Sequence, residues 1–102
     1  MSALSVNKNN FDQIKASENR VLLDFYADWC GPCRMVLPLV EQIADEYPQY
    51  TVAKVNVDAE PELAQAFGVS SIPTLIVMEN GNIIKRSMGA IPKQRILQLL
   101  ED

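Results

Sequence analysis

The order of apolar and polar residues along the chain predicts strands and helices that alternate. Segment 20–27 is an apolar run rich in strand-forming residues, interrupted by one carboxylate at Asp24, and it predicts a buried strand. Over segment 32–47, apolar residues recur at intervals of three and four positions, the spacing of a helix with one apolar face. Pro48 ends this predicted helix, and Pro38 should kink it.

A second strand and a second helix follow in the same order. Segment 51–57 alternates between apolar and polar residues, as a strand does. Segment 61–68 predicts a short helix that Pro61 opens and Gly68 closes. This strand–helix–strand order favours parallel pairing of the strands, with a right-handed crossover that places the helix on a face of the sheet.

The last third of the chain has a different pattern. Two strand-like segments flank Asn80-Gly81, the strongest short signal for a β-hairpin. A final helix is predicted from about residue 92, and another near residue 11, before the first long strand. We therefore expect an α/β fold in one domain, residues 1–102. Its central mixed sheet would combine parallel strands with a C-terminal antiparallel hairpin, flanked by helices on both faces.

Composition narrows the possible functions. The chain has 9 basic and 13 acidic residues, a net charge of -4, and no Lys/Arg cluster that could neutralise phosphates, so nucleic acid is not an expected partner. No apolar run approaches the ~18 residues of a membrane span, and the N-terminus lacks the apolar core of a signal peptide. We therefore expect a cytoplasmic protein with no membrane partner. Histidine is absent, which excludes imidazole as a base or a metal ligand.

The two cysteines, Cys30 and Cys33, enclose Gly31 and Pro32 in the stretch D-W-C-G-P-C-R. A zinc site needs about four ligands, usually thiolate and imidazole, so a metal would have to recruit carboxylates or a second subunit. Covalent haem attachment requires a histidine after the second cysteine, where this chain has Arg34. A purely structural disulfide would close a very short loop and add little stability. The remaining interpretation is redox exchange between the two sulfurs.

The predicted helix gives the two thiols different environments. Cys30 would stand at its N-terminal end, where free backbone N–H groups and the positive end of the helix dipole stabilise a thiolate. Cys33 would lie about one turn deeper, close enough to form a disulfide yet shielded by the fold. A free cysteine has a pKa of roughly 8.5, and these groups can lower it toward neutral pH. We therefore predict that Cys30 attacks and that Cys33 resolves.

Several motifs together resemble the thioredoxin family over almost the whole chain. The segment D-F-Y-A-D-W-C-G-P-C-R is followed, in order, by Pro38, V-A-K-V-N-V-D, S-I-P-T-L, E-N-G and M-G-A. The resemblance implies a protein-disulfide reductase that carries electrons to disulfide-containing target proteins and helps to keep the cytosol reduced. A monomer is the default expectation, since the sequence indicates no dimer interface. A thioredoxin reductase would restore its dithiol, and no cofactor or metal would be needed beyond the redox-active Cys30–Cys33 disulfide. Pro32 between the cysteines is typical of the reducing members of the family.

The resemblance also implies roles for residues outside the cysteine pair. Asp24 would be buried, as its apolar neighbours also predict, and would relay a proton to or from Cys33 through water. Lys54, on a neighbouring strand, would modulate the charge of Asp24. Pro73 would follow a cis peptide bond and lie against the cysteines.

A small apolar docking surface for the target protein is implied as well. Its members surround the cysteines and the proline loop: Trp29, Gly31, Pro32, Ile72, Gly89 and Ala90. The backbone of Ile72 would pair with an extended segment of the target. Ser71 stands where a glycine is common in the family, which bears on target preference. Two alternatives stay open: a binding subunit that does not use its thiols, and an oxidising or isomerising domain of a secretory compartment.

Overall fold

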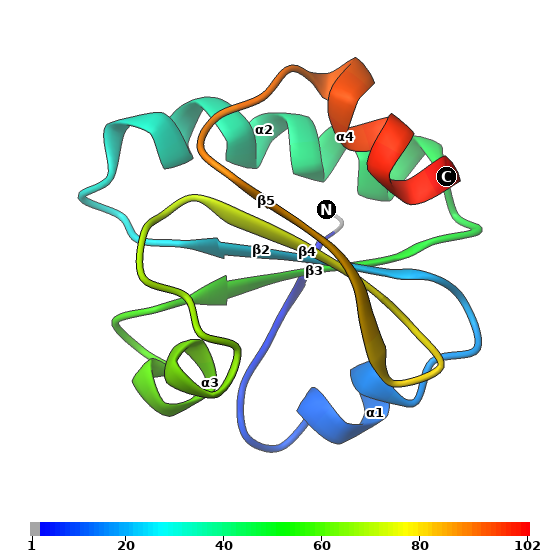
Figure 1. Ribbon diagram of the computed structural model, residues 1–102, viewed down its shortest axis with the longest axis horizontal. Helices are drawn as coiled ribbons and strands as arrows, with labels where there is room; N and C mark the ends of the chain where they lie inside the picture. The colour runs from blue at the N-terminus through cyan, green and yellow to red at the C-terminus, as the bar shows by residue number, and fades with distance from the viewer. Residues whose placement is uncertain (1–2) are drawn as a thin grey trace.

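Four helices surround a five-stranded sheet in the computed structural model, which describes residues 3–102 (Figure 1). The strands are β1 (Leu4–Ser5), β2 (Val21–Tyr26), β3 (Thr51–Asn56), β4 (Thr74–Glu79) and β5 (Asn82–Met88). The helices are α1 (Phe11–Lys15), α2 (Gly31–Glu46), α3 (Pro61–Ala66) and α4 (Lys93–Glu101). None of the helices within this described part combines the length and the apolar composition that crossing a bilayer requires.

The sheet is mixed, as the sequence predicts, with the strand order β1-β3-β2-β4-β5. Strand β3 pairs in parallel with both β1 and β2, while β4 is antiparallel to both β2 and β5. The hairpin between β4 and β5 turns at Asn80 and Gly81, whose φ angles of 54° and 81° are those that a tight hairpin turn requires. The two-residue edge strand β1 is an addition that the sequence pattern does not predict.

Two helices cover each face of the sheet, with α2 and α4 on one side and α1 and α3 on the other (Figure 1). Strand β2 lies at the centre, so both faces are covered, and all its residues except the last are buried. Leu22 packs with the core of α2 and α4, whereas Leu23 and Phe25 pack with the core of α1 and α3. Because side chains alternate along a strand, Asp24 shares the face of Leu22 and lies under α2.

The two ends of helix α2 agree with the positions of Pro32 and Pro48 in the sequence. Pro32 occupies its first turn, and the helix stops at Glu46, two residues before Pro48. The helix runs as one element through Pro38. Its apolar face presents buried side chains to the sheet: Cys33, Val36, Val40 and Ile43. Each such side chain stabilises the fold by about 1.5–3 kcal/mol when fully removed from water, so the apolar face holds the first turn of α2 against β2.

Candidate active site

Cys30 and Cys33 form a disulfide at the N-terminal end of α2, with their Cα atoms 5.2 Å apart. Cys30 is the N-cap residue, with an extended backbone (φ -90°, ψ 112°), and its Sγ accepts a hydrogen bond of 3.2 Å from the backbone N–H of Cys33. A cap of this kind occupies one of the N–H groups that a helix end leaves unpaired. The sulfur of Cys30 therefore sits where backbone donors and the helix dipole favour negative charge.

Both cysteines are largely buried, and the sequence analysis predicts this shielding for Cys33. Cys30 retains 5% of its surface and Cys33 only 1%. The two residues cluster with buried Ala27, and half-buried side chains pack around this group: Tyr26, Val57 and Ile72. The predicted order remains, with Cys30 the more exposed of the two. The more accessible side of the pair is therefore that of Cys30.

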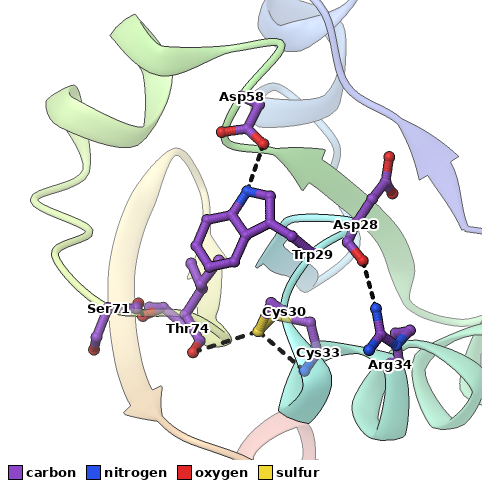
Figure 2. The surroundings of a disulfide bond; sticks show 9 residues. Asp28, Trp29, Cys30, Cys33, Arg34, Asp58, Ser71 and Thr74 are labelled. Atoms are coloured by element: carbon purple, nitrogen blue, oxygen red, sulfur yellow. Dashed lines mark hydrogen bonds between the residues drawn. A yellow bond between two sulfur atoms is a disulfide. The ribbon is translucent and has the colours of Figure 1, made fainter.

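Trp29 borders this approach and is held by a partner that the sequence analysis missed. Its side chain is 67% exposed, and the indole Nε1–H donates a 2.8 Å hydrogen bond to Asp58 Oδ2, an arrangement that Figure 2 shows beside the cysteine pair. Asp58 directly follows the V-A-K-V-N-V motif, at the end of β3. Arg34 braces the same loop from α2, because its Nη1–H donates 2.8 Å to the carbonyl oxygen of Asp28 (Figure 2).

The proline loop lies against the cysteines from the other side. The Ile72–Pro73 peptide bond is cis, as the resemblance implies, and the carbonyl oxygen of Ile72 lies 3.8 Å from Cys30 Sγ. The N–H of Gly89 donates 2.8 Å to the carbonyl oxygen of Pro73, which joins the M-G-A segment to this loop. Within the loop, Thr74 Oγ1–H donates 2.6 Å to the carbonyl oxygen of Ser71.

The predicted docking residues differ in exposure. Exposed members are Trp29, Gly31, Pro32, Gly89 and Ala90, while Ile72 is half-buried. Pro73, which is predicted to lie against the cysteines, is buried. Two exposed methionines lie close in sequence to the predicted docking residues, one on α2 and one in the M-G-A segment. Met35 follows the cysteines on α2 and is 69% exposed, and Met88 precedes Gly89 and is 62% exposed.

Asp24 is fully buried on the α2 face of β2, in agreement with the sequence prediction. Neither of its carboxyl oxygens accepts a hydrogen bond from the described residues. Burial raises the pKa of Asp24 from 3.8 to about 7, opposed by the positive charge of Lys54 and reinforced by the negative charge of Glu41. A carboxyl group with a pKa near neutral pH can both take up and release a proton under physiological conditions.

Lys54 lies directly opposite Asp24 in the parallel register of β2 and β3, so both side chains leave the same face of the sheet. Its Nζ does not pair with Asp24 but donates a 2.9 Å hydrogen bond to Glu41 Oε2 of α2. This bond, opposed by burial, raises the pKa of Lys54. Glu41 was not among the predicted site residues. Its position eight residues after Cys33 places it about two helical turns away on the same side of α2, a signal that could have found it.

The fold and this site define a class of protein. A cysteine pair at a helix end, a cis-proline loop against it and a buried acid under the same helix are suited to thiol–disulfide exchange. Residues 3–102 contain no group of three or more His, Cys, Asp or Glu side chains that could hold a metal ion. The redox centre is the cysteine pair itself, and the protein is a thiol–disulfide oxidoreductase.

Comparison with known proteins identifies the family. The family model described as Thioredoxin matches residues 2–102. A thioredoxin of Chlamydia muridarum is 45% identical over 95 residues, which cover 93% of this chain and 92% of the relative. Thioredoxin 1 of a Nostoc species is 43% identical over 102 residues, covering 98% of this chain and 95% of the relative. A solved single-substitution mutant of the thioredoxin from Halobacterium salinarum superposes with a TM-score of 0.91 at 37% identity, covering 98% of this chain and 88% of that one. The chain belongs to the thioredoxin family and is a thiol–disulfide reductase.

Proposed function

We propose that this protein reduces disulfide bonds in target proteins of the cytoplasm, with Cys30 as the attacking thiol and Cys33 as the resolving thiol. The position of Cys30 as the N-cap of α2, where its sulfur accepts the N–H of Cys33, carries the proposal. The same N–H and the helix dipole would stabilise the Cys30 thiolate once the pair is reduced. Cys33 has less exposed surface, which suits a thiol that reacts only inside the mixed disulfide.

The first step joins the protein to its target. The Cys30 thiolate attacks one sulfur of the target disulfide, so that the target S–S bond breaks and a Cys30–target disulfide forms. The displaced target sulfur leaves as a thiolate and takes a proton from solvent. The docking surface holds the target in this step: Trp29, Gly31, Pro32, Ile72, Gly89 and Ala90. The backbone of Ile72 pairs with an extended segment of the target beside Cys30 Sγ.

The second step releases the reduced target. Asp24, in its carboxylate form, accepts the proton of the Cys33 thiol through water, and the Cys33 thiolate attacks Cys30 Sγ. The mixed disulfide breaks, the Cys30–Cys33 disulfide forms, and the second target sulfur leaves with a proton. The target has gained two electrons from the cysteine pair and two protons, one from solvent and one equivalent to the proton that Cys33 released. Lys54, whose Cα lies opposite that of Asp24 in the sheet, tunes this step through the effect of its positive charge on the pKa of Asp24.

The oxidised pair must be reduced again for another cycle, and we assign this step to a thioredoxin reductase. A relative from Mycobacterium leprae is named bifunctional thioredoxin reductase/thioredoxin, and it is 48% identical over 93 residues, 90% of this chain and 20% of that protein. A cytoplasmic location belongs to the proposal because a dithiol that donates electrons has to be kept reduced by its compartment. A monomer that needs neither nucleic acid nor a membrane is sufficient for this cycle.

Two single substitutions test the assignment of the thiols. With dithiothreitol as the electron donor, Cys30→Ser should lower the rate of insulin reduction to that of dithiothreitol alone, because the attacking sulfur is gone. Cys33→Ser, reduced beforehand and freed of dithiothreitol, should still attack insulin but should accumulate the mixed disulfide, which mass spectrometry of the acid-quenched mixture detects. If Cys33→Ser behaved like Cys30→Ser and no adduct formed, the assignment would be wrong. If both variants kept full biological activity, the protein would act as a binding subunit instead.

A further inference from the structure

We propose that Glu41 is a positioning residue for the exchange reaction, because its carboxylate holds the ammonium group of Lys54 away from Asp24. The inference rests on the proposed role of Asp24 as the proton acceptor for Cys33. Three charged side chains from three elements meet here: Asp24 of β2, Lys54 of β3 and Glu41 of α2. Asp24 and Glu41 could each form an ion pair with the ammonium group of Lys54. The structure pairs it with Glu41, the partly exposed carboxylate on α2.

Both oxygens of the Glu41 carboxylate are engaged. Oε2 accepts the 2.9 Å hydrogen bond from Lys54 Nζ, and Oε1 accepts a 2.9 Å hydrogen bond from the backbone N–H of Ala3, next to β1. The donors at Ala3 and Lys54 overcome the effect of burial and lower the pKa of Glu41, so the group is ionised at neutral pH. The carboxylate is therefore a fixed negative charge, tied to β3 through Lys54 and to the residue before β1 through Ala3.

The position of Lys54 in the sheet allows its ammonium group to pair with either Asp24 or Glu41. Its Cα is opposite that of Asp24 in the β2–β3 register, and neighbouring strands lie about 4.8 Å apart, so its long side chain can reach either carboxylate. A direct pair with Asp24 would bring the ammonium group into the apolar space under α2, where loss of hydration is costly. The half-buried position beside Glu41 keeps the ammonium group in contact with solvent, at 23% side-chain exposure.

The charge of Glu41 matters for the pKa of Asp24 because few of the groups that face Asp24 are charged. Strand β4 places apolar Leu75 opposite Asp24, and the buried α4 side chains on this face are apolar. The titratable groups come from the other three elements: Tyr26 of β2, Lys54 of β3, and Cys33 and Glu41 of α2. In the oxidised protein Cys33 carries no proton, so Lys54 and Glu41 are the charges that act on Asp24. Loss of the Glu41 charge both removes a negative neighbour and frees the Lys54 ammonium group to turn toward Asp24.

The test is a titration of the Asp24 side chain in the oxidised full chain, followed by NMR of its ¹³C-labelled carboxyl group. Glu41→Gln keeps the shape of the side chain and an acceptor oxygen for the N–H of Ala3. We expect it to lower the pKa of Asp24 by about one pH unit, the lower end of the effect of an opposite charge within about 4–6 Å. Most of this fall should disappear in a Lys54→Met background, because Glu41 acts through Lys54.

Glu46→Gln is the matched control, because Glu46 lies on the same helix and forms a similar ion pair, 2.7 Å from Lys93 Nζ. It should leave the titration of Asp24 unchanged. An unchanged pKa of Asp24 in Glu41→Gln would overturn the positioning role, and so would an equal fall with and without Lys54.

The rate of insulin reduction against pH separates this inference from the proposed function. If Asp24 must be ionised to accept the Cys33 proton, the acid limb of the Glu41→Gln profile should move to lower pH by the same amount as the pKa of Asp24. A lowered pKa of Asp24 without movement of the acid limb would support the positioning role of Glu41. The proton-acceptor role of Asp24 would then be the part that fails.

Discussion

Replacement of Asp24 by asparagine should remove one large contribution to the pH dependence of stability. The pKa of Asp24 rises from 3.8 to about 7 in the folded protein, chiefly because the carboxyl group is buried. Well below pH 3.8 the group is protonated in both the folded and the unfolded state, and it contributes no pH-dependent cost. Between about pH 4 and about pH 7 the unfolded state has lost the proton while the folded state keeps it, so stability falls across this range and levels off above about pH 7.

The size of the effect follows from the two pKa values. One pH unit of difference corresponds to about 1.4 kcal/mol, so ionisation of Asp24 costs the folded state about 4 kcal/mol above neutral pH. Asp24 is fully buried, and screening by solvent does not reduce this figure. The amide that Asp24→Asn introduces would itself be buried, and this cost is the same at every pH. The difference in unfolding free energy between Asp24→Asn and the wild type should therefore grow by about 4 kcal/mol from about pH 4 to about pH 8.

Urea unfolding of the oxidised protein, repeated across this pH range, measures that difference directly. Asp12→Asn is the control, because it removes the same charge from an exposed position on α1. Its stability should follow that of the wild type without the large divergence. If the curves of Asp24→Asn and the wild type ran parallel from acid to neutral pH, Asp24 would ionise as easily in the folded protein as in the unfolded chain. The argument for its proton exchange with Cys33 would then fail.

Two further changes probe the rim of the active site. Asp58→Ala should lower kcat/KM for insulin reduction by about two- to tenfold, because one hydrogen bond of about 0.5–1.5 kcal/mol no longer orients Trp29. Asp28→Ala removes a neighbouring exposed carboxylate and should leave kcat/KM for insulin reduction unchanged. If kcat/KM fell equally in both variants, the loss of negative charge alone would explain the effect. Gly89→Ala should reduce stability by about 1–2 kcal/mol in urea unfolding, because φ is +90° there. Gly31→Ala is the control, because the φ angle of Gly31 is not positive and there is space around it for a Cβ atom. If both variants lost the same amount of stability, backbone strain at Gly89 would not be the cause.

Local patterns in the sequence were enough to predict most of the elements and the location of the redox pair. Strand β2 is apolar along nearly its whole length because it is covered on both faces, so its pattern reports burial directly. The Asn80-Gly81 turn predicts its hairpin because few residue pairs accept two consecutive positive φ angles. Cys30 could be placed at a helix end because Pro32 favours the first turn of a helix. Each of these signals acts over a few neighbouring residues.

Tertiary structure alone decided the contacts between distant segments. Strand β1 is only two residues long and carries no periodic pattern, so its pairing with β3 could be seen only in the folded sheet. The antiparallel pairing of β4 with β2 depends on the path of the chain after α3. The burial of Cys30 could be seen only in the folded protein, because Val57 after β3 and Ile72 of the proline loop, which pack around the pair, are far from it in sequence.

The hydrogen bonds of the functional side chains are also contacts between segments that are distant in the sequence. Glu41 and Lys54 are 13 positions apart, and Trp29 and Asp58 are 29 apart. Each pair forms only when a helix or a loop is placed on the sheet in one particular register and at one particular angle. The sequence by itself determined which chemical groups the protein has and where the two sulfurs lie on a helix. The packing of α2 on β2 and β3 decided which charges surround Asp24, because electrostatic interactions depend on distance in space and not on separation along the chain.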